Sequence, residues 1–260
     1  METMAVDRKY EKNNLTNVLF KVDFIKLSNE VIFNNDFFNV VNKHFPVIEK
    51  DELIASGQIL IDMQDGNPQQ PIINNEILIK KNLSNPNNES RISYNTEFLG
   101  IELKKYNGYE SIKPIIEDIL NNLFIHKNKN ISVRRIGLRF INHYDLSKYK
   151  SLNKYFNKDL LSALNIGKSL TSIQQIRALS RLEFSFNESK LNFQYGLYNP
   201  DYPAVINKQY YVLDYDCYFE GVLDDPDKII KKIDENHKMI QYVFENSIND
   251  QLRKEMIILE

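Results

Sequence analysis

The sequence predicts an α+β protein with two halves of antiparallel sheet, packed helices and a long C-terminal helix. Segments typical of strands and of helices are segregated rather than strictly alternating, which favours an antiparallel sheet. Several strand-like segments alternate apolar and polar residues, as expected for a sheet that buries one face. Residues 226–247 repeat apolar residues at helical spacing. The chain has 260 residues, 42% of them hydrophobic, and is long enough to fold without disulfides or a metal.

The first half is expected to hold a strand, a helix, several strands, a second helix and a last strand, an order that a ferredoxin-like arrangement accommodates. Asn35 or Asp36 is expected to cap the first helix and Pro46 to end it. Ser111 is expected to cap the second helix, with Pro114 in its first turn. The segments are strands at 15–27, 53–62, 77–81, 92–105 and 132–144, helices at 35–47 and 111–127, and a loop at 83–90.

The predicted organisation is a flexible N-terminus, residues 1–14, followed by two α+β halves, 15–148 and 149–260, that share one core. The long last helix is expected to begin at the cap signal Asp224–Asp225–Pro226. The segments of the second half are a helix at 151–165, strands at 173–186, 190–198 and 209–220, and the helix at 226–247.

Charge and residue usage exclude several classes of protein. The net charge is −2, whereas general nucleic-acid binders carry a basic excess. Cys217 is the single cysteine, and four histidines lie far apart, so we expect neither a disulfide framework nor a metal site, and no cofactor. The sequence holds no run of 18 apolar residues and no secretory signal, which predicts a cytoplasmic protein without a membrane span.

Charged side chains are expected to gather on one face of the C-terminal strands, opposite the apolar residues that alternate with them. Two interpretations remain open. The first is that the charged residues form cross-strand ion pairs that hold the strands in register. The second is that the arginines form a binding site for an anion or a phosphate. The glycine at position 137, between two arginines, suggests that another group approaches the strand there. The candidate binding residues are Arg135, Arg139, Arg181, Glu183, Asp214, Asp216 and His143.

Weaker patterns suggest catalysis. Glu102 and Lys104 form an E-x-K pair on a predicted strand, a spacing found in metal-dependent nucleases, and Asp62 could supply the further carboxylate. Alternating charges of this kind are also typical of any exposed strand. His143 lies near Asp145 in the sequence and could act as a general base. A histidine at a strand end is, however, more often structural.

Three segments carry a family resemblance. The run R-I-G-L-R-F-I-N, Arg135–Asn142, resembles the signature of a sporadically distributed, functionally uncharacterised bacterial protein family. Residues 98–119, with Tyr106 and Tyr109 before a helix, are similar to a second segment of that family. Residues 234–256 are similar to its L-H-x-x-I-x-x-x-F-E-x-x-I-T pattern, which the chain meets with His237, Ile240, Phe244, Glu245, Ile248 and Met256.

The resemblance covers most of residues 15–256, with three departures, one of which is the absence of tryptophan. Asn249 stands where threonine is usual, and Asn13–Asn14 replaces a lead-in that contains proline. The family implies no activity that can be transferred. Its patchy distribution is typical of mobile or defence-associated genes.

We therefore expect a non-enzymatic binding or regulatory protein that contacts another macromolecule in a bacterial toxin or anti-phage defence context. The expected partner is a toxin, an effector, a phage component or a second copy of the chain in a homodimer. The alternatives are a metal-dependent nuclease or phosphodiesterase and an RNA-binding module, because ferredoxin-like sheets can present aromatic residues to bases.

Overall fold

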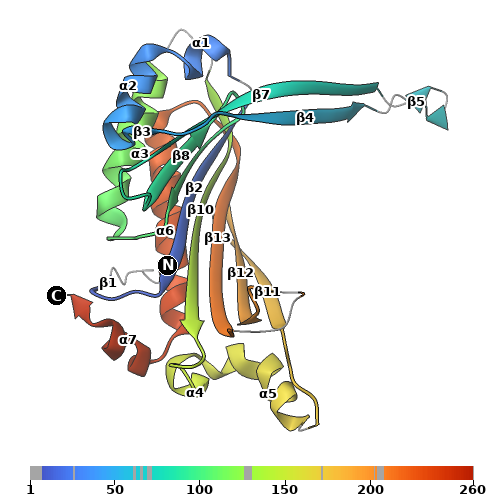
Figure 1. Cartoon of the computed structure of the whole chain (residues 1–260), viewed down its shortest axis with the longest axis vertical. Coiled ribbons are helices and arrows are strands. Elements are labelled where there is room, and N and C mark those ends of the chain that lie inside the picture. Colours follow the sequence, from blue (N-terminus) through green and yellow to red (C-terminus); the bar gives the residue numbers. More distant parts are fainter. Residues whose placement is uncertain are drawn as a thin grey trace.

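A ten-stranded antiparallel sheet forms the body of the protein in the computed structural model (Figure 1). The structure describes residues 8–25, 27–60, 63–64, 67–68, 72–125, 131–170, 172–201, 203 and 208–259. The strands run in the order β11-β12-β13-β10-β2-β9-β8-β7-β3, and β4 also pairs with β7. They are β2 (Leu15–Ile25), β3 (Val47–Ile48), β4 (Glu52–Leu60), β7 (Ile72–Ser84), β8 (Ser90–Tyr94), β9 (Phe98–Leu103), β10 (Ser132–Asp145), β11 (Ala178–Phe186), β12 (Ser189–Tyr198) and β13 (Tyr210–Leu223).

The chain passes twice through the same order of elements. A first strand is followed by short helices, a three-stranded meander and a longer helix. The helices of the first unit are α1 (Asn29–Ile32), α2 (Asn35–His44) and α3 (Tyr109–Ile125); those of the second are α4 (Leu152–Tyr155), the 3₁₀ helix η1 (Lys158–Leu161), α5 (Ser162–Ser169) and α6 (Pro226–Ser247). A ferredoxin-like order has two strands between its helices. The second unit has three there, β11, β12 and β13. The first unit has its meander β7–β9 and, before it, β3, β4 and the short strands β5 (Met63–Gln64) and β6 (Asn67–Pro68).

The two units meet where their first strands, β2 and β10, pair antiparallel in the middle of the sheet. The strand β10 therefore opens the second unit of this description. The predicted division into halves 15–148 and 149–260 stays a prediction. One cluster of buried residues runs across both units.

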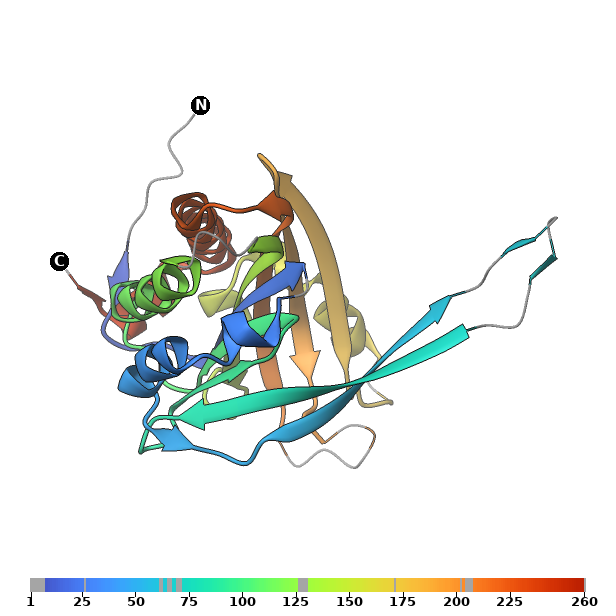
Figure 2. The same ribbon diagram turned by 90° about the horizontal axis from the view of Figure 1, so that it is seen from above.

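The helices α2, α3 and α6 lie on the same side of the sheet (Figures 1 and 2). Alternation explains this arrangement, because Val18, Phe20, Val22 and Phe24 on β2 are buried beneath them while the intervening residues are more accessible. The α+β class, the antiparallel sheet and the long C-terminal helix predicted from the sequence are confirmed.

Helix ends match the prediction where the cap signal is unambiguous. The helix α6 begins at Pro226, and the side chain of Asp225 accepts a hydrogen bond from the main-chain N–H of Asp227. Two other caps were predicted wrongly. Asn34, not Asn35 or Asp36, caps α2 by accepting from the N–H of Phe37. Ser111 lies inside α3, which begins at Tyr109.

Two further segments differ from their predicted form. The expected helix at 151–165 is divided into α4, η1 and the start of α5. Part of the expected flexible N-terminus is paired, since β1 (Lys9–Tyr10) forms a small sheet with β14 (Ile258–Leu259), which follows helix α7 (Asp250–Met256). Residues 1–7 of that segment lie outside the described residues. Over the part of the chain that is described, no helix combines the length and the apolar character needed to cross a membrane.

Candidate functional site

The predicted charged face exists, and its central feature is a two-bond ion pair. Arg139 on β10 donates from Nε and Nη2 to the two carboxylate oxygens of Asp214 on β13, at 2.8 and 2.6 Å. The Asp214 side chain is 9% exposed and that of Arg139 is 44% exposed. This contact raises the pKa of Arg139 above its ordinary value. The guanidinium of Arg139 is therefore already matched to a carboxylate within the sheet.

Arg135 lies flat on the same face. Its guanidinium carbon is 4.5 Å from the centre of the Tyr218 ring, and its terminal nitrogens are 4.0 Å from Asp23 and 3.8 Å from Asp216. Gly137 explains how it fits, because a Cβ at that position would be 3.3 Å from Nη1 of Arg135. The glycine that the sequence marked as unusual makes room for an arginine side chain of the same strand.

The remaining predicted residues of this face lie farther out or at its end. Arg181 and Glu183 pair with each other along the exposed edge strand β11, at 3.0 Å. His143 stacks against Tyr198, with ring centroids 5.3 Å apart, and burial lowers its pKa. Arg139–Asp214 and Arg135–Asp216 join β10 to β13, whereas Arg181–Glu183 lies within β11. Binding by this face stays a prediction.

The structure places the weak catalytic candidates apart from any described carboxylate cluster. Glu102 on β9 accepts a hydrogen bond from Asn17 at 2.8 Å, and Lys104 lies 3.5 Å from the side-chain oxygen of Asn88. Asp62 lies outside the described residues. Within the described ranges, no group of three or more His, Cys, Asp or Glu side chains is placed to hold a metal ion. The nuclease and RNA-binding alternatives stay predictions.

Cys217 faces the core, as expected from the alternation of β13. It is fully buried beside Asn236 and Met239 of α6, and burial raises the pKa of its thiol to about 12. A thiol in this state is a poor nucleophile.

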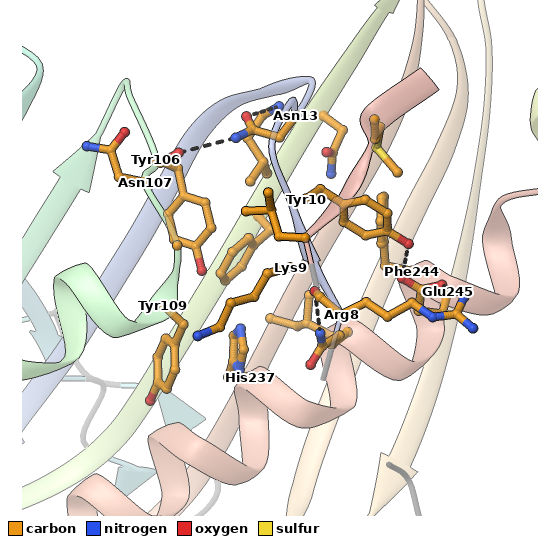
Figure 3. A pocket seen from close by; sticks show the side chains of 18 of the residues that line it. Arg8, Lys9, Tyr10, Asn13, Tyr106, Asn107, Tyr109, His237, Phe244 and Glu245 are labelled. Atoms are coloured by element: carbon orange, nitrogen blue, oxygen red, sulfur yellow. Dashed lines mark hydrogen bonds and ion pairs between the residues drawn. The ribbon is translucent and has the colours of Figure 1, made fainter. Parts of the chain in front are cut away.

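A cavity of about 400 Å³ lies on the helical side of the sheet, a feature that the sequence interpretation missed (Figure 3). Its walls come from the start of α3, from β10, from α6 and from the segment that contains β1. Pockets that hold small molecules begin at roughly 300 Å³. The principal lining residues are Lys9, Tyr106, Tyr109, Phe140, Asn142, His237, Ile240 and Phe244.

The aromatic walls of the cavity are held in place by contacts between α3 and α6. The rings of Tyr109 and His237 are parallel within 8°, with centroids 3.9 Å apart. The Tyr109 hydroxyl donates to Asp234 at 2.8 Å, so its polar end is already engaged. Tyr106 meets Phe140 edge to face at 5.2 Å.

The segment over the cavity is anchored by a buried carboxylate. Glu245 on α6 accepts hydrogen bonds from Arg8 at 3.0 Å, from Tyr10 at 2.5 Å and from Arg253 at 2.9 Å. Its side chain is 7% exposed. Because three donors surround one buried carboxylate, the cover of the cavity is tied to both α6 and α7.

Three segments that the sequence analysis singled out, 98–119, 135–142 and 234–256, converge on this cavity. Tyr106 and Tyr109 come from one, Phe140 and Asn142 from the second, and His237, Ile240, Phe244, Glu245 and Met256 from the third. One signal could have revealed the site. Asn142 occupies the apolar phase of β10, after Ile136, Leu138 and Phe140, and a polar residue in that phase faces the core.

A second feature missed from the sequence is a projecting ribbon. The strands β4 and β7 pair from Glu52–Lys80 to Leu60–Ile72 and extend away from the body of the protein (Figure 2). Leu53 lies opposite Ile79, and Ala55 opposite Ile77, which places these side chains on one face of the ribbon. Leu53 is 73% exposed and Ile77 is 68% exposed.

Ion pairs fix the base of the ribbon to the sheet. Lys80 binds Glu52 at 2.6 Å, and Lys81 binds Asp51 at 2.5 Å. Arg91 on β8 lies 2.8 Å from Glu49. The charges at the base are thus balanced, and the apolar side chains of Leu53 and Ile77 are exposed beyond them.

Comparison of the chain with models of known protein families and with curated proteins finds no match.

Proposed function

We propose that this chain is a non-enzymatic binding protein that contacts another protein through the β4–β7 ribbon. The observation that carries the proposal is the exposed apolar face of that ribbon, with Leu53, Ile77 and Ile79 side by side on neighbouring strands. A two-stranded ribbon is marginally stable in water by itself and gains stability from packing against a further surface. Exposed apolar side chains gathered on a projecting element are typical of protein contact sites.

Charge supports a protein partner over nucleic acid. The net charge is −2, and the lysines at the base of the ribbon are paired with carboxylates. Binding to a phosphate backbone depends on cations that are free to replace counterions. An apolar surface with a balanced charged rim suits the core and rim of a protein interface.

The biological setting of the proposal comes from the family resemblance and from composition. We place the protein in the bacterial cytoplasm, with a toxin, a defence effector or a phage component as its partner. A second copy of the chain is the other partner that an exposed ribbon can accept, since exchange of identical elements is a common route to homodimers.

The test compares two variants that are matched in exposure and chemistry. Leu53→Asp charges the ribbon face, where the side chain is 73% exposed. Ile166→Asp charges α5, at the opposite end of the molecule, where the side chain is 65% exposed (Figure 1). Each protein is used to capture partners from the native host, and the affinity of the purified partner is then measured by calorimetry. Light scattering of the purified chain gives its mass in solution.

We expect the ribbon variant to lose the partner, with an affinity weakened about tenfold or more, and the α5 variant to retain it. A homodimer would instead appear as a dimeric wild-type protein and a monomeric ribbon variant. Equal partner binding by all three proteins, with unchanged mass, would rule out the ribbon as the contact.

A further inference from the structure

We infer that the cavity between α3, β10 and α6 is a binding site for a small, uncharged, planar aromatic molecule that carries an N–H or O–H donor. This site is separate from the proposed contact on the ribbon. Three properties of the cavity lead to this class of ligand: the rings in its walls, the balance of its charges, and one buried amide.

The aromatic side chains in the cavity walls favour a ligand with an aromatic ring. Tyr109 and His237 form a stacked pair on one side, and Tyr106 and Phe140 form an edge-to-face pair beside it. In Figure 3 the labelled rings surround the cavity, and Lys9 extends toward Tyr109 and His237. The hydroxyls of Tyr10 and Tyr109 are bound to carboxylates, so these two residues offer ring surface to a ligand. Aromatic rings prefer stacked or edge-to-face partners.

The charges around the cavity select a neutral ligand. The lining contributes the cations Arg8 and Lys9 and the carboxylates Glu11, Glu110 and Glu245. Glu245 is bound by Arg8 and also by Arg253, which lies outside the lining. With Arg253 included, three cations stand against three carboxylates, so neither a carboxylate nor an ammonium group on the ligand would meet an excess of the opposite charge.

Asn142 selects a hydrogen-bond donor. It is 4% exposed and lies on the apolar face of β10. Among the described residues, the bond recorded for its side chain joins Nδ2 to the main-chain oxygen of Leu213 at 3.4 Å, which leaves the side-chain oxygen to accept another donor. Asn142 lines the cavity, and a ligand that supplies an N–H or O–H gains a hydrogen bond to that oxygen.

The chain itself provides a sensitive assay, because it contains no tryptophan. Fluorescence from an indole excited beyond the tyrosine band comes from the ligand alone. Indole is the probe, 1-methylindole is the same ring without the N–H donor, and indole-3-acetate is a charged relative. Binding of each is followed by fluorescence titration and by the shift of the melting temperature.

Three variants locate the site. Asn142→Leu keeps the size of the side chain and removes the acceptor, and Ile240→Phe fills the cavity from α6. Asn192 lies on β12 and alternates with the buried residues Leu191 and Phe193, so it faces away from the core. Asn192→Leu is the control, because it removes an amide outside the cavity. Circular dichroism confirms that each variant is folded before binding is measured.

We expect indole to bind saturably, about fivefold or more tighter than 1-methylindole, and tighter than indole-3-acetate. Asn142→Leu is expected to abolish the preference for indole over 1-methylindole, Ile240→Phe to abolish binding, and Asn192→Leu to change neither. Absence of saturable binding, or binding that Ile240→Phe leaves unchanged, would overturn the cavity as the site. Equal binding of indole and 1-methylindole to the wild type would overturn the donor class.

Discussion

Tyr109 and His237 connect the two units of the fold. Tyr109 belongs to the last helix of the first unit and His237 to the last helix of the second, and their rings stack at 3.9 Å. The Tyr109 hydroxyl and the Lys113 ammonium both donate to Asp234 of α6, at 2.8 and 2.9 Å. Burial and the bond to Asp234 raise the pKa of Tyr109 well above its ordinary value.

Two substitutions of Tyr109 should separate the stability contributed by its hydroxyl from that contributed by its stacked ring. Tyr109→Phe keeps the stack and removes one hydrogen bond, so we expect the free energy of unfolding to fall by about 1 kcal/mol. Tyr109→Leu also removes the stack, and a further loss of about 1 kcal/mol is expected. Urea unfolding measures both, and an equal loss in the two variants would show that the stack contributes nothing.

Neutralisation should destabilise the protein at Asp214 but not at Asp216. Asp214→Asn breaks the two-bond contact with Arg139, and a loss of about 1.5–3 kcal/mol is expected. Burial raises the pKa of Asp216 above its ordinary value, so the folded state binds its proton more tightly than the unfolded chain does. The stability that this proton contributes is lost as pH rises through the raised pKa of Asp216. At neutral pH the ionised carboxylate therefore destabilises the folded state.

Asp216→Asn is therefore expected to leave the stability at pH 7 within about 0.5 kcal/mol of the wild type or to increase it. Urea unfolding of the two variants at neutral pH makes the comparison. A large loss in Asp216→Asn would mean that its contacts with the arginines outweigh the cost of burying the charge.

His143 should make stability depend on pH in the acid range. Burial lowers its pKa in the folded state, and the charge of Asp214 only partly opposes this. The unfolded chain then binds a proton at His143 below pH about 6.5, where the folded state does not yet do so. Stability should therefore fall as pH falls from about 6.5 to the lowered value. His143→Gln is expected to flatten this part of the curve, and melting temperatures measured across the range test it; parallel curves would contradict the assignment.

Among the glycines of the sheet whose surroundings the structure describes, Gly196 should be the one that least tolerates a side chain. Its φ is +135°, and a Cβ there would overlap the main-chain oxygen of Ala178 on the neighbouring strand β11. We expect Gly196→Ala to lower the free energy of unfolding by about 2–3 kcal/mol. Gly100→Ala on β9 is the matched control, because its Cβ would lie 3.7 Å from the oxygen of Phe20, an ordinary contact. The control is expected to stay within about 1 kcal/mol of the wild type.

The elements that sequence predicted well are those whose signals are local. The cap at Asp225 and the proline after it fix the start of α6, and alternation along β10 separates Leu138 from Arg139 correctly. The cap of α2 was misplaced because adjacent residues have nearly the same capping chemistry, and only the main-chain geometry selects Asn34.

Features made by distant residues could not be predicted in the same way. The pairing of β1 with β14 joins residues far apart in the chain, and the cavity beneath it depends on that pairing. The ribbon was visible as two strand-like segments, but nothing local showed that β4 pairs with β7 outside the main stack of strands. The charged residues of β10 and β13 were grouped correctly on one face, since that grouping follows from strand alternation alone.

The seam between β2 and β10 has a consequence for how the chain acquires its structure. The hairpins of each meander bring together neighbouring stretches, and the pairs β2–β9 and β10–β13 close each unit over longer spans. The seam joins Val22 to Ile136, across the whole first unit. Closing so long a loop carries an entropic cost that must be met before the contacts form. The middle of the sheet is thus the part expected to assemble last, and until it does, each half exposes an unpaired inner strand on which newly made chains can associate wrongly.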